Sequence, residues 1–217
     1  MNSTVPTEDA APVSTVGPRR ATASAGRLGQ DIALVASFAA LIAVCALMPA
    51  IMVAGVPTPI TLQTFGVMLA GLVLGSRRGA LAVLLYLAIG AAGAPVFASG
   101  ASGLAPFVGP TSGYLIGFPL LAFGVGWGVR AILALGEQGA ALKGFRIVVT
   151  VSLSLLISLV TVHALGITGM ALRVPMALQD AFIADLIFLP GDIIKTTAAV
   201  LVASAVLRAF PVLRELR

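Results

Sequence analysis

Long apolar stretches recur along most of the chain and are separated by short segments that hold most of the charged residues. Hydrophobic side chains make up 59% of the 217 residues and charged ones only 10%, with a mean hydropathy of +1.09. Since about a quarter of the residues in a soluble domain are charged, this composition predicts a membrane protein. A spanning helix needs about 20 apolar residues, so the chain has room for about six spans and for no large soluble domain.

The apolar stretches predict an all-α membrane protein with six transmembrane helices. The expected spans cover residues 31–53, 60–74, 80–94, 112–133, 145–167 and 182–209. Residues 1–30 are rich in Ser, Thr, Ala and Pro and lack hydrophobic periodicity, which is typical of a disordered tail. The membrane domain is therefore expected to comprise residues 31–210, followed by a short tail of residues 211–217.

The sixth stretch is longer than one perpendicular helix requires. It contains the run FLPGDIIK at residues 188–195. Proline is favoured in the first turn of a helix and glycine relaxes the backbone, so a break is predicted at FLPG. The crossing helix would then begin at Pro190, with Asp192 and Lys195 in its first two turns.

Basic residues follow a one-sided pattern that predicts the orientation in the membrane. Eleven of the 13 would lie on the same side of a six-span protein, namely Arg19, Arg20, Arg27, Arg77, Arg78, Arg130, Lys143, Arg146, Arg208, Arg214 and Arg217. Cytoplasmic loops carry such an excess, so both termini are expected on the cytoplasmic side of the cell membrane. The net charge of +5 then reflects topology, and no nucleic-acid partner is expected. Residues 56–63, 94–114 and 189–195 would lie toward the outer face.

Four motifs occur in the order and spacing of a known family: PITLQ (59–63), GAPVFA (93–98), GPTSGYLIGF (109–118) and PGDIIK (190–195). Over residues 32–209 the chain resembles the BioY family, the biotin-specific substrate-binding (S) component of energy-coupling factor (ECF) transporters. The family pattern has two glycines in PTGGY, whereas this chain has Ser112 at the first of them. That serine adds a side chain to the local turn.

The resemblance implies a transport protein that captures biotin at the outer face and delivers it inward, without covalent chemistry. It also implies two kinds of partner, a transmembrane coupling subunit and a pair of ATPases, although some relatives are considered able to work without them. No phosphate-binding loop GxxxxGK[ST] is present, so energy must come from another subunit or an ion gradient. No HExxH or GxSxG motif occurs either. We expect neither an enzyme nor a bound cofactor.

Biotin carries a carboxylate, an apolar chain and a ureido ring, so its site needs a cation, hydrogen-bond donors and acceptors, and apolar walls. Lys195 can supply the cation, and Asp192 can accept from the ureido N–H groups. The two are three residues apart and share one helix face. The remaining predicted binding residues are Gln63 and Thr61 as donors to the ureido carbonyl, and Tyr86, Phe97 and Tyr114 as flat walls.

Small residues in the first span provide a candidate docking surface. Ala36, Ala39, Ala40 and Ala43 form two small-xxx-small pairs on neighbouring faces, and such faces allow close backbone approach in lipid. They could pack inside the bundle or, as the resemblance implies, dock the coupling subunit. The single cysteine, Cys45, excludes an intrachain disulfide and is expected to serve in packing.

Several alternatives stay open from the sequence. Asp192 and Lys195 could simply neutralise each other inside the bundle. The protein could be an S component for a different vitamin, or a proton- or sodium-coupled secondary carrier with Asp185 or His163 as the coupling group. His163 is the only histidine and has no carboxylate near it in sequence, so a hydrogen-bonded interior role is favoured over a proton relay. Whether residues 94–114 form a lid is likewise open.

Overall fold

The computed structural model describes residues 19–134 and 140–215, and most of them are helical. Within these ranges the sheet-like pairing is limited to one antiparallel bridge, between Ile51 and Ile60. The longer helices are α1 (Arg19–Leu47), α2 (Gln63–Leu74), α3 (Ser76–Ala91), α5 (Ser112–Ala134), α6 (Ala140–Ser158), α7 (Ala164–Arg173), α8 (Leu178–Asp185) and α9 (Leu189–Ala209). Shorter elements are η1 (Ala98–Gly100), α4 (Ala105–Val108), η2 (Leu159–His163), η3 (Leu186–Phe188) and α10 (Val212–Glu215). The predicted all-α fold is confirmed.

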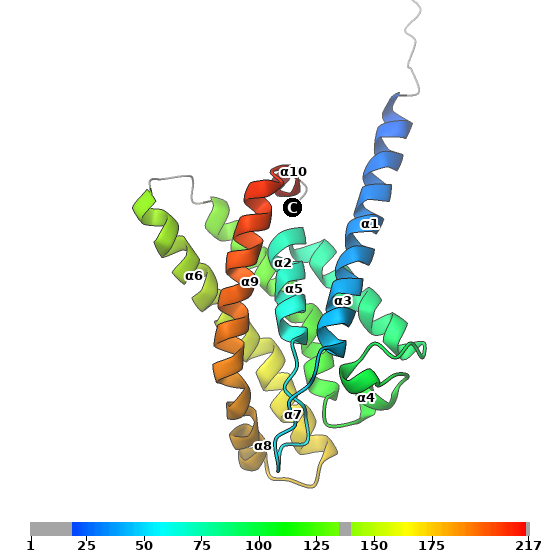
Figure 1. Ribbon diagram of the computed structural model, residues 1–217, viewed down its shortest axis with the longest axis vertical. Coiled ribbons are helices and arrows are strands. Elements are labelled where there is room, and N and C mark those ends of the chain that lie inside the picture. The colour runs from blue at the N-terminus through cyan, green and yellow to red at the C-terminus, as the bar shows by residue number, and fades with distance from the viewer. Residues whose placement is uncertain (1–18, 135–139, 216–217) are drawn as a thin grey trace, which may run out of the picture.

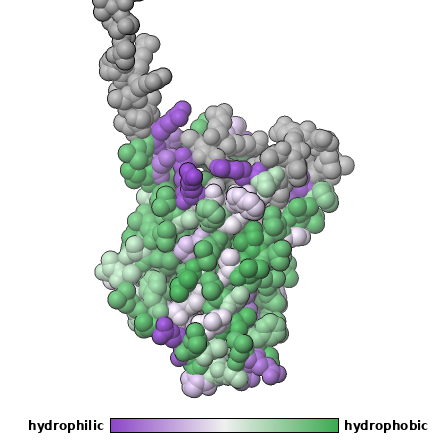
Figure 2. Space-filling model, turned by 180° about the vertical axis from the view of Figure 1, so that it is seen from behind, coloured by the Kyte–Doolittle hydropathy of each residue, from purple (hydrophilic) through white to green (hydrophobic). Residues whose placement is uncertain are grey.

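Four helical segments are long and apolar enough to cross a membrane. They are Arg27–Leu47, Ser112–Ala131, Gly144–Arg173 and Leu178–Ala209. By contrast, α2 has 12 residues and α3 has 16, which at about 1.5 Å per residue gives about 18 and 24 Å. Both are shorter than a hydrocarbon core of about 30 Å. Figure 2 shows apolar side chains over the middle of the visible face, between the two ends of the bundle, as a membrane protein requires.

Helix α2 lies at the centre of the bundle. All of its residues except Phe65 are buried, and it packs against α1, α3, α5 and α9. A helix that is apolar all round is stable only when other elements surround it. On its α5 side the packing is so close that a Cβ added to Gly71 would lie 2.4 Å from the carbonyl oxygen of Ala122.

The two ends of the bundle differ in chemistry (Figure 1). At one end lie the start of α1, the α2–α3 junction, the start of α6 and the short α10. There the Arg78 guanidinium pairs with the Asp31 carboxylate at 2.7 Å and ties α3 to α1. At the opposite end lie the connections formed by residues 48–62, 92–111 and 174–177. The structure thus separates the arginine-rich connections from the Gly- and Pro-rich ones, as the sequence predicts.

Three predicted boundaries need correction. Helix α1 begins at Arg19, so the predicted disordered tail is wrong for residues 19–30, and residues 1–18 lie outside the described part of the chain. The same helix ends at Leu47 instead of residue 53, because Pro49 removes an amide donor and disfavours helical geometry in the residue before it. In the predicted C-terminal tail, residues 212–215 form α10.

The predicted break at FLPG is a change of helix type and not an interruption. A short 3-10 turn, Leu186–Phe188, joins α8 to α9, so the chain stays helical from Leu178 to Ala209. Pro190 lies in the first turn of α9, where its missing N–H removes one donor from the otherwise continuous helix at the change of helix type. Asp192 and Lys195 fall in the first two turns of α9, as predicted.

The close contact of α2 with α5 predicts a stability change. Gly71→Ala should destabilise the protein by about 1–3 kcal/mol, because the added methyl has no room beside the Ala122 backbone. Gly29→Ala in α1 is the matched control, since nothing lies within 4 Å of the added Cβ, and it should leave stability unchanged or slightly raised. Thermal unfolding in detergent measures both. Equal melting temperatures for Gly71→Ala and the wild type would contradict the packing described above.

Candidate functional site: a polar pocket inside the bundle

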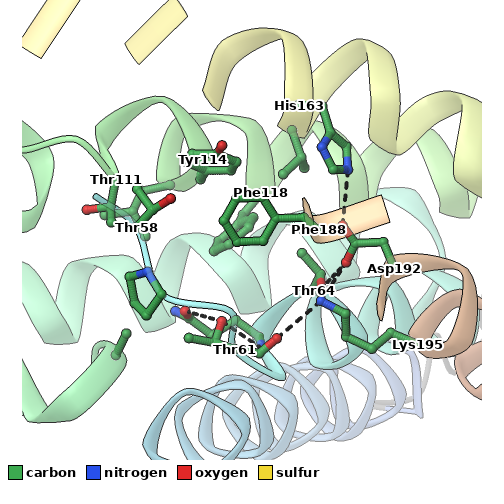
Figure 3. A pocket seen from close by; sticks show the side chains of 15 residues that line it. Thr58, Thr61, Thr64, Thr111, Tyr114, Phe118, His163, Phe188, Asp192 and Lys195 are labelled. Atoms are coloured by element: carbon green, nitrogen blue, oxygen red, sulfur yellow. Dashed lines mark hydrogen bonds and ion pairs between the residues drawn. The ribbon is translucent and has the colours of Figure 1, made fainter. Parts of the chain in front are cut away.

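A pocket lies toward the end of the bundle that carries the Gly- and Pro-rich connections, because residues of the 48–62 and 92–111 connections line it. Figure 3 shows its side chains. Its wall combines side chains from η1, α2, α5, η2, η3 and α9 with the segments before α2 and α5. The lining residues are Thr58, Pro59, Thr61, Gln63, Thr64, Ala98, Thr111, Tyr114, Leu115, Phe118, Val162, His163, Phe188, Asp192 and Lys195. Apolar rings and aliphatic groups thus alternate with a small number of convergent polar groups, as is usual for small-molecule sites.

The acid–base pair on α9 is closed and buried. The Lys195 ammonium lies 2.5 Å from Oδ1 of Asp192, and the two residues are 9% and 3% exposed. Lys195 also donates to the backbone carbonyl of Thr61 at 3.2 Å, while the Thr64 hydroxyl donates to the same carboxylate oxygen of Asp192 at 3.2 Å. The pair therefore joins α9 to α2 and to the connection that precedes α2.

His163 connects two carboxylates. Its Nε2 lies 3.1 Å from Oδ2 of Asp192, and its Nδ1 lies 2.7 Å from Oδ2 of Asp185. The Tyr114 hydroxyl donates to the other oxygen of Asp185 at 2.7 Å. The expected interior, hydrogen-bonded role of His163 is confirmed, but the carboxylates missing from its sequence neighbourhood are supplied by other helices.

The backbone around His163 has an irregular helical turn. Residues 159–163 form a π-helical turn between α6 and α7, and such turns are common at functional sites. The adjoining face of α5 carries Gly113 and Gly117. An added Cβ would come within 1.8 Å of the Leu165 carbonyl at Gly113 and within 2.7 Å of the Thr161 carbonyl at Gly117. These glycines allow α5 to lie in direct backbone contact with the irregular turn and with the first turn of α7.

A second chain of hydrogen bonds leads from the pocket into the core. The Thr61 hydroxyl donates to the Gln63 side-chain carbonyl at 2.9 Å, and the Gln63 amide donates to the Tyr86 hydroxyl at 2.7 Å. Gln63 is 5% exposed, so Tyr86 fixes the orientation of a buried amide that faces the pocket.

Five of the seven predicted binding residues line the pocket: Asp192, Lys195, Gln63, Thr61 and Tyr114. The structure does not bring Tyr86 and Phe97 to its wall. Phe97 packs edge-on against Tyr86, with ring centroids 5.5 Å apart, and lies against Gly90, where an added Cβ would be 2.2 Å from the ring. Phe97 anchors the 92–111 connection to α3. Like Tyr86, it therefore supports the residues of the pocket wall without lining the pocket itself.

Sequence reasoning missed several lining residues, and their signals differ. Thr64 and Thr58 flank the PITLQ motif and Thr111 lies in GPTSGYLIGF, so motif membership could have indicated them. Phe118 is the last residue of GPTSGYLIGF and shares that signal, whereas Phe188 is an ordinary apolar residue in an apolar stretch and carries none. Their place in the wall depends on how α5 and η3 face each other.

The four alanines of the predicted docking surface divide between two faces of α1. Ala39 is 3% exposed and Ala43 is half-buried, and both pack against the core. Ala36 and Ala40 are exposed. The prediction is therefore wrong for Ala39, which is already covered inside the bundle, and a partner could reach only the face with Ala36 and Ala40.

The fold and the pocket together define a class. The molecule has an apolar exterior, membrane-length helices and a buried site built from donors and acceptors. In the described part of the chain, no group of three His, Cys, Asp or Glu residues could hold a metal ion. These features fit a membrane protein that binds a small polar molecule within a helical bundle.

Comparison with known proteins identifies the family. Residues 17–212 match the BioY family. The chain is 40% identical to the biotin transporter BioY of Rhizobium etli, over 85% of this chain and 96% of that protein. It is 41% identical to the biotin transporter BioY of Rhodobacter capsulatus, over 84% and 95% of the two chains. A crystal structure of the S component for biotin from an ECF-type ABC transporter superposes with a TM-score of 0.76 and 27% identity, covering 84% of this chain and 93% of that one. The chain belongs to the BioY family, a family of transport proteins and not of enzymes.

The Asp192–Lys195 pair predicts a measurable coupling. Lys195→Met should destabilise the protein strongly, by about 3–5 kcal/mol, because it removes the ammonium that lies against the buried Asp192 carboxylate and leaves a negative charge uncompensated. The double variant Asp192→Asn/Lys195→Met should be more stable than Lys195→Met alone. Thermal unfolding of the two single variants and the double variant completes the cycle. Additive losses would show that the two side chains do not compensate each other's charge.

Proposed function

We propose that this protein binds biotin in the polar pocket and is the substrate-binding component of a biotin uptake system. The observation that carries the proposal is the buried Asp192–Lys195 pair beside Gln63 and Thr61 in the pocket wall. These groups supply the cation, the donor and the acceptor that the carboxylate and the ureido ring of biotin require. The names of the relatives and of the similar crystal structure point to the same ligand.

Each part of biotin has a partner in this wall. Asp192 accepts from a ureido N–H, and Lys195 offers the cation for the carboxylate. The Gln63 amide carries two N–H groups; one donates to Tyr86, and the second donates to the ureido carbonyl. Tyr114, Phe118 and Phe188 supply apolar surface for the ring and the valeryl chain.

The proposed membrane topology has six crossings with both termini in the cytoplasm. The short helices α2 and α3 follow each other in opposite directions, with α2 inside the bundle and one face of α3 exposed, and the connection before α2 completes the crossing where α2 itself is too short. Arg77, Arg78, Arg146 and Arg208 lie at the end that would face the cytoplasm. The pocket then lies toward the outer face, and the 92–111 connection covers it as a lid. Non-helical backbone near membrane depth is tolerated where it lines a cavity, and residues of both the 48–62 and the 92–111 connections line this pocket.

The proposed partners are an ECF transmembrane coupling subunit and a pair of ATPases in the cytoplasmic membrane. Ala36 and Ala40 form an exposed small-residue face on α1, which permits close contact with a helix of the coupling subunit. Whether transport requires these partners is decided by uptake in cells that lack them.

A second candidate function is an ion-coupled carrier. The buried His163–Asp185 contact favours it, because ionisable groups inside membrane proteins often serve as proton relays. Uptake that stops when the ion gradient is collapsed, and continues when ATP is depleted, would select this candidate.

Biotin binding tests the site directly. Purified protein in detergent should bind radiolabelled biotin, and both Asp192→Asn and Lys195→Ala should lower the affinity at least about 100-fold, since each removes a buried charged partner. The matched control is Asp180→Asn, because Asp180 is exposed on α8 and does not line this pocket. Its affinity should equal that of the wild type.

Two outcomes would overturn the proposal. If the wild type fails to bind biotin but binds another vitamin, the fold assignment stands and the ligand is wrong. If both α9 variants bind as tightly as the control, the ligand lies elsewhere in the bundle.

The docking face has its own test. Ala36→Trp/Ala40→Trp should abolish co-purification with the coupling subunit and leave biotin affinity unchanged, because the bulky rings prevent close helix contact far from the pocket. Leu172→Trp, on the exposed surface of α7, is the control and should co-purify normally. Loss of biotin binding in the alanine variant would indicate a damaged bundle and contradict a role confined to docking.

A further inference from the structure

The contacts of His163 need one more proton than a neutral imidazole provides. Both ring nitrogens face carboxylate oxygens, Asp192 at 3.1 Å and Asp185 at 2.7 Å. A neutral imidazole has one N–H and one lone pair, so one of these contacts would place a nitrogen lone pair against a carboxylate oxygen. With protons on both nitrogens, each contact is a charge-assisted hydrogen bond. All three residues are 3% exposed, so water cannot compensate for a mismatch.

We propose that His163, Asp185 and Asp192 form a buried proton-binding site, in which the imidazole carries a proton on each nitrogen and thereby holds Asp192 in the geometry that binds the ligand. His163 is then a positioning residue whose protonation sets the affinity of the pocket. The proton site itself does not depend on the proposed function, whereas its effect on biotin affinity does.

Charge balance supports this proton. Two carboxylates, Asp185 and Asp192, stand against the ammonium of Lys195. A doubly protonated His163 supplies the second cation and makes the buried group neutral. With both aspartates ionised, a neutral imidazole would leave one uncompensated negative charge in the interior, which costs several kcal/mol.

The elements packed on His163 bring few other ionisable groups. From α5, the Tyr114 hydroxyl donates to Asp185; from α9, Lys195 reaches the far oxygen of Asp192. On α6 and α7, the basic residues with described side chains are Arg146 and Arg173, 17 and 10 residues from His163 along nearly continuous helix. At about 1.5 Å per residue they lie about 25 and 15 Å away. The titration of His163 is therefore governed by the two aspartates.

Asp185 is the part of this cluster that ligand binding does not explain. It does not line the pocket, yet it is buried and accepts from both Tyr114 and His163. A carboxylate in this position gives the second ring nitrogen an acceptor. The π-helical turn and the glycine contacts of α5 fix the ring between the two acids. The position of the imidazole is therefore determined by backbone packing.

Loss of the proton should disturb the pocket through Asp192. An unprotonated Nε2 no longer donates to Oδ2, and the carboxylate is repelled from its position beside Lys195 and Thr64. Ligand affinity should then fall with rising pH once the proton leaves. For one proton, the fall is at most about tenfold per pH unit.

The single histidine of the chain makes the test unambiguous. We would label the full-length protein with 15N-histidine, purify it in detergent without a histidine tag, and record the ring nitrogen resonances without ligand. The expected result is two protonated nitrogens at neutral pH, where an imidazole in water is mostly neutral. One protonated nitrogen at neutral pH would overturn the proposal, whatever the protein binds.

Biotin binding across the same pH series tests the coupling. Affinity should be constant while both nitrogens are protonated and should fall over the pH range where the ring signal changes. Constant affinity across that range would overturn the positioning role. If the wild type binds no biotin at any pH but shows the doubly protonated ring, the proposed function fails and the proton site stands.

Two variants and a control complete the experiment. His163→Gln cannot titrate and should bind biotin about tenfold more weakly, without the pH dependence of the wild type. Asp185→Asn leaves the pocket wall intact and should show one protonated ring nitrogen at neutral pH; an unchanged doubly protonated ring would contradict the role of Asp185. It also keeps the proposal testable if His163→Gln does not fold.

Ser158→Ala, next to the π-helical turn, is the control. The Ser158 hydroxyl is buried without a hydrogen-bond partner in the described structure, so the pH profile of this variant should match that of the wild type.

Discussion

The carboxylate of Asp192 is the constraint on which the rest of the structure depends. An ionised carboxylate inside an apolar bundle is stable only if donors surround it, and here these donors come from three separate elements. Thr64 reaches it from α2, His163 from η2 and Lys195 from its own helix α9. The helices that carry them must therefore meet at the same depth in the bundle, and each must be rotated about its own axis so that its donor faces Asp192. The polar pocket forms at that meeting point, so the interactions that stabilise the bundle also create the binding site.

The short central helix explains why such a meeting point can exist. If α2 were of full membrane length, its first turn would lie near the end of the bundle; because it begins only at Gln63, the extended segment before it folds inward instead. Its backbone groups are satisfied inside the protein: the Thr61 carbonyl accepts from Lys195, and Ile51 and Ile60 bond each other. In lipid, unpaired groups of this kind would cost several kcal/mol each. A helix too short to span thus brings polar backbone and side chains to the depth of the ligand.

The sequence was sufficient for the fold class and for the α9 pair, and insufficient for the histidine cluster. Apolar length and helix periodicity are local properties, and so is the three-residue spacing of Asp192 and Lys195. The contacts of His163 with two aspartates join residues 22 and 29 positions apart on different elements. They also depend on a π-helical turn, for which the apolar run around residues 159–163 gives no signal. Tyr86 and Phe97 failed as wall residues for a related reason. Phe97 belongs to the GAPVFA motif and Tyr86 to the apolar stretch before it, but only packing against Gly90 and Gln63 decides which side of the wall each ring occupies.

Most hydrogen-bond acceptor positions of the Asp192 carboxylate are already occupied, and this determines how a ligand can bind to it. In this structure its two oxygens accept from Lys195 and Thr64 on one side and from His163 on the other. A carboxylate has about four acceptor positions, so Oδ2 retains one for a ligand N–H, whereas Oδ1 has none left unless Lys195 moves. A ligand with a carboxylate of its own can attract Lys195 and vacate a second position; a neutral ligand cannot. Selection for a molecule that combines a negative charge with N–H donors therefore follows from the competition for Lys195, and it requires that His163 keep Asp192 in place while Lys195 changes partner.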